Sequence, residues 1–103
     1  NRARSMRLGV IMMFTLTAHN IPEGLAVSVS SVSSASRGMV VAVAIAFHNV
    51  PEGLAIATPI YAATRSLSKA VAMAFLSGLS EPLGALMALT VLRPAFEASV
   101  ARP

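Results

Sequence analysis

Two six-residue stretches, HNIPEG at 19–24 and HNVPEG at 48–53, carry the side chains of this sequence that could perform chemistry. Each combines an imidazole, an amide, a proline and a carboxylate within a long apolar segment. A third acid, Glu81, also precedes a proline, and it follows the second motif's glutamate by 29 residues, just as that glutamate follows the first. Imidazole nitrogens, carboxylates and amide oxygens are ligands of divalent cations. The repeated pattern therefore predicts a metal site.

Helical spacing places the ligands of each motif on one face. His19 and Glu23 are four residues apart, as are His48 and Glu52, so each pair shares a helix face. At about 100° per residue, each glutamate lies between the histidine of its motif and the asparagine. This arrangement suits two adjacent ions bridged by the glutamates, one position rich in nitrogen and the other in oxygen. Glu81 would complete the second position. The predicted ligands are His19, Asn20, Glu23, His48, Asn49, Glu52 and Glu81.

The composition indicates a membrane protein. Of 103 residues, 55% are hydrophobic and 12% are charged, whereas soluble proteins average about 25% charged residues. Three stretches lack basic residues, and each is longer than the roughly 20 residues that a helix needs to cross a bilayer. We therefore predict an all-α membrane protein with three transmembrane helices in up-down-up order. The helices are expected near Leu8–Ser30, Gly38–Tyr61 and Ser68–Leu92.

Turn residues separate these helices. The serine-rich stretch 30–36 with Arg37-Gly38 predicts the first turn, and 63–66 predicts the second. Arg93-Pro94 is expected to end the third helix, with 95–103 as a loop or the start of a further segment. Five basic residues lie near one side and three near the other, which places the N-terminus and the second turn in the cytosol. Strands are not expected, because no strict alternation of polar and apolar residues occurs.

Equal distances from the two turns place the three acids at one depth. From turn to acid is about 12 residues, or about 18 Å of helix, and half of a hydrocarbon core is about 15 Å. Unpaired carboxylates at the midplane cost at least a few kcal/mol each, which favours a bound cation. The prolines Pro22, Pro51 and Pro82 should free the carbonyls of Ala18, Phe47 and Gly78. Broken helices around polar ligands are typical of transporters.

Several alternatives compete with this interpretation. The three helices could form the core of a soluble all-α protein, but the charged outer face of such helices is missing. A soluble di-iron carboxylate bundle, an oxidase, uses Glu-x-x-His, whereas here the order is reversed and the gap is four. A proton-conducting channel could use the same acids. A single histidine or proline is more often structural, and Thr15, Thr17, Ser28 and Ser77 are expected to pack or to bond to backbone.

The sequence contains no features that indicate other functional classes. The sequence has no cysteine, and therefore no thiolate site. No basic stretch is interleaved with aromatic residues, so a nucleic-acid partner is not expected. Neither a nucleophile–base pair nor a phosphate-binding glycine loop is apparent. We therefore expect that the protein is not an enzyme and uses no organic cofactor.

The two motifs and SEPLG at 80–84 resemble the ZIP (Zrt/Irt-like) family of divalent-metal transporters, and most closely its bacterial-type zinc-uptake subgroup. The resemblance covers nearly the whole chain and aligns it with the family's fourth, fifth and sixth transmembrane helices. It implies that HNIPEG contributes His19, Asn20 and Glu23, that HNVPEG contributes His48, Asn49 and Glu52, and that SEPLG contributes Glu81. It also implies a binuclear site at the membrane midplane and metal uptake toward the cytosol.

The family has eight spans, so the resemblance implies that residues 1–103 are a partial transporter domain. The remaining helices of the full-length protein and the lipid bilayer are the expected partners, and a second copy of the chain is a further candidate. The expected location is the plasma (cytoplasmic) membrane or an organelle membrane. Zinc is the first expected substrate, followed by iron, manganese and cadmium.

Overall fold

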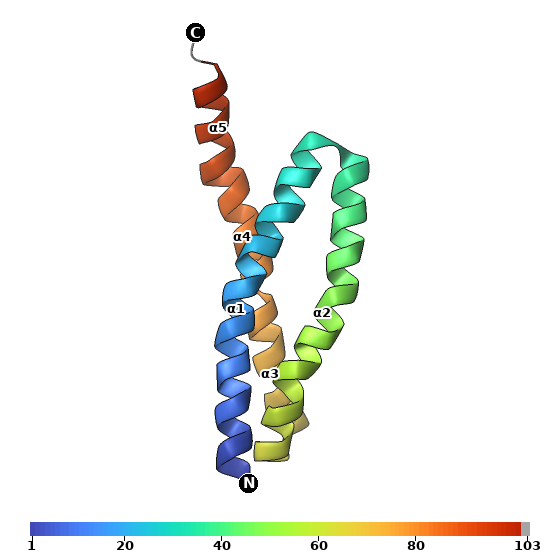
Figure 1. The fold of residues 1–103 in the computed structure, drawn as a ribbon, viewed down its shortest axis with the longest axis vertical. Helices are drawn as coiled ribbons and strands as arrows, with labels where there is room; N and C mark the ends of the chain where they lie inside the picture. Colours follow the sequence, from blue (N-terminus) through green and yellow to red (C-terminus); the bar gives the residue numbers. More distant parts are fainter. Residues whose placement is uncertain (102–103) are drawn as a thin grey trace.

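The structure, a computed structural model, describes residues 1–101 and is helical almost throughout. Its elements in chain order are α1 (Arg2–Ser33), α2 (Ala35–Thr64), α3 (Leu67–Gly78), α4 (Ser80–Met87), the π-helical η1 (Ala88–Leu92) and α5 (Arg93–Val100). Helices α1 and α2 form an antiparallel hairpin, and the remaining elements form a third rod that returns beside it (Figure 1). Three stretches, 2–33, 35–64 and 67–100, are long and apolar enough to cross a membrane. The predicted all-α class with three spans is confirmed.

The first turn lies within the predicted stretch 30–36, but it is shorter than predicted, because the other residues of the stretch are helical. Only Ser34 leaves the helical conformation between α1 and α2. The hydroxyl groups of Ser31 and Ser33 donate to carbonyl oxygens four residues back, so the helix itself satisfies these polar groups. The side chain of Ser34 then accepts from the Arg37 backbone N–H at 3.2 Å and caps α2. The connection is therefore a single residue.

The third span continues past Arg93-Pro94, contrary to the prediction that these residues end it. Pro94 lies in the first turn of α5, where a missing backbone N–H costs little. The turns before it widen into η1, in which the hydroxyl of Thr90 donates to the Leu86 carbonyl. Residues 95–100, predicted as loop, are therefore helical. Residues 102 and 103 of the predicted loop lie outside the described residues.

Among the three site prolines, only Pro82 lies beside an interruption. Helices α1 and α2 run continuously through Pro22 and Pro51. The third span breaks at Leu79 and restarts at Ser80, so that Pro82 falls in the first turn of α4. A proline is tolerated there because first-turn N–H groups have no intrahelical partner. The break places a kink at the level of the two motifs.

The third span leans across the hairpin. Its first part, α3, packs against α2, while α4 packs mainly against α1. The crossing of α1 and α4 is close, because the hydrogen of Gly24 faces the Glu81 carbonyl and that of Gly84 faces the Ile21 carbonyl. Small residues permit such contact between membrane helices. This crossing brings Glu81 to the level of the two motifs.

The buried apolar core is small and lies toward the N-terminal end of α1. It consists of Ile56, Ile60 and Ala70, surrounded by partly buried side chains that include four methionines. Large apolar side chains elsewhere face outward, and the side chains of Phe14 and Phe47 are 72% and 77% exposed. Such extensive apolar exposure is expected where lipid or further helices cover the surface.

Candidate metal centre

Two histidines and two glutamates from the two motifs converge between α1 and α2. Nε2 of His19 lies 3.2 Å from Oε1 of Glu23 and 3.4 Å from Oε1 of Glu52. Nε2 of His48 lies 3.5 Å and 3.1 Å from the same two oxygens. The four ligand atoms all lie within 4.8 Å of one another. Each helix therefore contributes one His and one Glu, and every histidine contacts both carboxylates.

The separations between histidine and glutamate match those of zinc ligands. Zinc bonds to imidazole nitrogen and carboxylate oxygen are about 2.0–2.1 Å, so two ligand atoms of a tetrahedral zinc lie about 3.3 Å apart. The four nitrogen–oxygen distances, 3.1–3.5 Å, bracket this value. The two rings meet edge to face, with centroids 6.0 Å apart. Two nitrogens and two oxygens form a donor set that suits zinc.

The two motifs also contribute buried oxygens without partners. Four buried side-chain oxygens have no hydrogen-bond partner within the described chain, namely Asn20 Oδ1, Glu23 Oε2, Asn49 Oδ1 and Glu52 Oε2. Leaving a buried acceptor unpaired costs about 1–3 kcal/mol each, which favours a bound partner. A cavity of about 60 Å³ is bordered by Asn20, Asn49 and Glu52. An oxygen-binding cation would satisfy this group.

The third span meets both asparagines. Asn49 Nδ2 donates to Glu81 Oε2 at 2.7 Å, and Asn20 Nδ2 donates to the Ser77 carbonyl at 3.2 Å. Glu81 therefore lies beside the oxygen-rich position and outside the four-residue His/Glu group. The sequence predicts a free carbonyl at Gly78. The carbonyl that accepts the side-chain hydrogen bonds is that of Ser77, one residue earlier. The structure thus brings all seven predicted ligands into one region.

Sequence reasoning did not single out Ser80 and treated Ser77 as a packing residue. Both are buried, and the Ser80 hydroxyl donates to the Ser77 carbonyl at 2.6 Å. The Ser77 hydroxyl shares a hydrogen bond of 2.9 Å with that of Thr17. Thr15, which was expected to pack or to bond to backbone, is exposed. The available signal was the polar residue directly before Glu81-Pro82 in an apolar span; it is the first residue of α4, and its hydroxyl donates back to α3 instead of capping α4.

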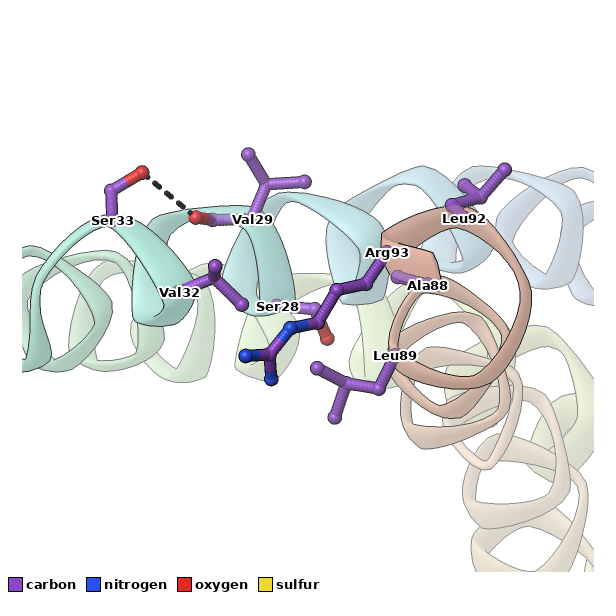
Figure 2. Close-up of a pocket in the computed structure, with 8 residues that line it drawn as sticks. All are labelled: Ser28, Val29, Val32, Ser33, Ala88, Leu89, Leu92 and Arg93. Carbon is purple, nitrogen blue, oxygen red and sulfur yellow. Dashed lines mark hydrogen bonds between the residues drawn. The ribbon is translucent and has the colours of Figure 1, made fainter. Parts of the chain in front are cut away.

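A larger cavity, of about 360 Å³, lies away from these residues between α1 and η1. Figure 2 shows its lining, in which apolar side chains such as Val29 and Leu89 predominate and Arg93 reaches back toward Ser28. Ser33 at its edge donates to the Val29 carbonyl of its own helix. The lining includes no histidine or carboxylate, so this cavity offers no comparable site for a cation.

Known proteins share this sequence pattern. The family described as ZIP Zinc transporter matches residues 2–101. The chain is 56% identical over 91 residues to "Zinc transporter ZupT" of Chlorobium luteolum, covering 88% of this chain and 34% of that protein. The proteins of the same name from Neisseria meningitidis and Clostridium perfringens are 52% and 50% identical. These alignments cover 90% and 88% of this chain, and 35% and 32% of those proteins.

The chain spans about a third of the length of these curated relatives. No solved structure gives a significant match.

Proposed function

Because this chain belongs to the ZIP family of zinc transporters, we propose that its three spans bind divalent cations during their transport across a membrane. The relatives are named zinc transporters, and zinc is accordingly the proposed substrate, with iron, manganese and cadmium as further candidates. The direction is toward the cytosol. The function is transport and not catalysis, and no organic cofactor takes part.

Two adjacent metal positions are proposed, with Glu23 and Glu52 as ligands of both. The first uses their Oε1 atoms with the Nε2 atoms of His19 and His48. The second uses their Oε2 atoms with the Oδ1 atoms of both asparagines, and the free oxygen of Glu81 completes it. The observation that carries this proposal is that Oε1 of each glutamate lies near both histidines, while Oε2 of each glutamate and Oδ1 of each asparagine are buried without a partner within the described chain. The ligands are His19, Asn20, Glu23, His48, Asn49, Glu52 and Glu81.

The protein is an integral membrane protein, and its apolar outer faces contact lipid or further helices. We propose that the full-length protein supplies those helices, and that a second copy of the chain is a candidate partner. The membrane is the plasma membrane, as for a bacterial uptake system, or an organelle membrane. The exposed apolar side chains disfavour the soluble di-iron oxidase, which would need a charged outer surface.

Flux measurements on the full-length protein test this proposal. Reconstituted in vesicles, the protein should carry radiolabelled zinc, and a structure determined with cadmium should show anomalous density between His19 and His48. A control with empty vesicles sets the background, and proton flux is recorded in parallel. If protons cross and zinc does not, the protein is a channel of the alternative kind. If no density lies between the two histidines, the first position is wrong.

Acid should weaken metal binding at the first position. Histidine binds a metal as the neutral imidazole and glutamate as the carboxylate, so protons compete for the same atoms. With two imidazoles and two carboxylates as ligands, zinc affinity should fall steeply as the pH is lowered. Zinc titrations of the purified full-length protein at a series of pH values would measure this. An affinity that stays constant down to about pH 5 would contradict histidine ligation.

A further inference from the structure

We infer that the interruption of the third span orients the amides of Asn20 and Asn49, with Ser80 as a positioning residue, so that only oxygens face the second metal position. The inference rests on the proposed function, because it concerns the ligands of that site. It explains why the second metal position has oxygen ligands only. Helices α1 and α2 supply the asparagines, whereas the third span decides which end of each amide points inward.

An asparagine amide offers a donor at one end and an acceptor at the other. Beside the buried oxygens of Glu23 and Glu52, the donor end would ordinarily turn inward and satisfy the carboxylates. The structure shows the opposite. Both Oδ1 atoms are buried and have no hydrogen-bond partner within the described chain, while both Nδ2 atoms donate to the third span. Some feature therefore holds the amides against their local preference.

The two acceptors that hold the amides lie on either side of the break at Leu79. The Ser77 carbonyl in the last turn of α3 accepts from Asn20, and Oε2 of Glu81 in the first turn of α4 accepts from Asn49. An uninterrupted helix would direct the Ser77 carbonyl along its axis, toward the backbone N–H of residue 81. At the break, the Ser77 carbonyl accepts instead from a side chain of the neighbouring helix α1.

Ser80 stabilises the Ser77 carbonyl as an acceptor for Asn20. Its hydroxyl donates to the Ser77 oxygen at 2.6 Å, and Asn20 occupies the same oxygen at 3.2 Å. A carbonyl oxygen has two lone pairs, so both donors fit. Thr17 on α1 meets the Ser77 hydroxyl at 2.9 Å and fixes the same residue against that helix. Without the Ser80 hydroxyl, the carbonyl can return to the helix axis and release Asn20.

A released amide would change the selectivity of the second position. With its donor end inward it would satisfy a carboxylate oxygen and present a positive dipole to an arriving cation. The first position would keep its ligands, because neither histidine contacts the third span through a described hydrogen bond or ion pair. Loss of orientation should therefore weaken oxygen-ligated ions such as Mn²⁺ selectively.

The test uses the full-length protein in detergent, loaded with one equivalent of Zn²⁺, and measures Mn²⁺ binding by electron paramagnetic resonance. We expect Ser80→Ala to weaken Mn²⁺ binding about tenfold or more, as for other residues that orient ligands, with Zn²⁺ affinity unchanged. Ser80→Thr keeps a hydroxyl and should restore most of the affinity. The matched control is Ser28→Ala, because Ser28 is also buried and donates at 3.0 Å to the third span, at Ala85. It should leave both affinities unchanged.

The outcomes separate the inference from the function on which it rests. Equal weakening of both metals by Ser80→Ala, no weakening, or the same effect in Ser28→Ala would overturn the positioning role. If Ser80→Ala does not fold, Thr17→Val decides, because it loses only the hydroxyl contact to Ser77. Selective Mn²⁺ weakening in that variant supports the inference, and unchanged binding overturns it. A wild-type protein that binds neither metal would instead refute the proposed function.

Discussion

Replacing Glu23 by alanine in the full-length protein should abolish metal uptake, with a fall of about 100-fold or more. Even residues that only orient ligands change affinity by about 10–100-fold, and Glu23 is a proposed ligand of both metals. Its Oε1 lies 3.2 Å and 3.5 Å from the two histidines, and its Oε2 is buried without a partner. One substitution therefore removes an anchor from both positions. Uptake of radiolabelled zinc in cells, normalised to the amount of protein in the membrane, measures the effect.

The free energy of unfolding of the metal-free Glu23→Ala protein shows whether uptake is lost because a ligand is missing or because the protein misfolds. Glu23 and Glu52 place two carboxylates together, with side chains 12% and 11% exposed, beside histidines whose side chains are about half exposed. Removing one of them also removes an unpaired acceptor, whose burial costs about 1–3 kcal/mol. The free energy of unfolding of the metal-free Glu23→Ala protein should therefore be no lower than that of the wild type. If misfolding caused the loss of uptake, the free energy of unfolding of the variant would be lower than that of the wild type.

Glu97 supplies a matched control. It is the fourth acid of the chain, it lies on α5, and its exposed side chain pairs with Arg93 at 2.9 Å. Glu97→Ala makes the same chemical change outside the site, and uptake should remain as in the wild type. If Glu23→Ala leaves uptake unchanged, Glu23 is not a ligand and the shared site is refuted.

Gly24→Ala should destabilise the protein by about 2 kcal/mol and weaken the second metal position. A Cβ at residue 24 would overlap the Glu81 carbonyl oxygen and lie 2.7 Å from the Ala85 nitrogen. These are backbone atoms, so no side chain can rotate away, and α1 and α4 must separate. Such overpacking costs about 1–3 kcal/mol or more, which exceeds the roughly 1 kcal/mol gained from helix propensity. Gly84→Ala should act alike, because its Cβ would overlap the Ile21 carbonyl.

Gly53→Ala is the matched control, because Gly53 ends the second motif as Gly24 ends the first. Apart from its chain neighbours and the nearby backbone of its own helix, no heavy atom of the described chain lies within 4 Å of a Cβ built there. Its free energy of unfolding should stay within about 0.5 kcal/mol of the wild type or rise. The comparison uses thermal or denaturant unfolding of the metal-free protein, since Gly53 borders the small cavity beside Asn49. Equal stability of the two variants would contradict the close crossing of α1 and α4.

Much of the fold and the site could be predicted from the sequence. Apolar stretches without basic residues indicate the three spans, because a bilayer admits few charges and requires helices of a minimum length. The i,i+4 spacing of histidine and glutamate fixes a shared helix face. The even spacing of the three glutamates places them at one depth in an antiparallel arrangement. The structure has His19, Glu23, His48 and Glu52 in contact, as these arguments require.

Local signals failed where polar groups could find partners inside the helix or at its ends. The serines of 30–36 are typical turn residues in water, yet Ser31 and Ser33 bond to their own helix, and the connection is confined to Ser34. Likewise, Pro94 ends no helix, because it falls in the first turn of α5. Whether a serine or a proline terminates a helix depends on what satisfies the backbone nearby, which composition does not specify.

The sequence by itself determined which atoms are available as ligands, and at which depth and on which face of each helix they lie. It could not distinguish the two copies of the motif, because HNIPEG and HNVPEG differ only in one apolar residue. The tertiary structure distinguishes them, since α4 crosses α1 at Gly24 while Gly53 has no such neighbour. It also decides the direction of each asparagine amide. An amide turns toward the acceptor that packing brings to it, and here both acceptors come from a third helix that breaks at Leu79.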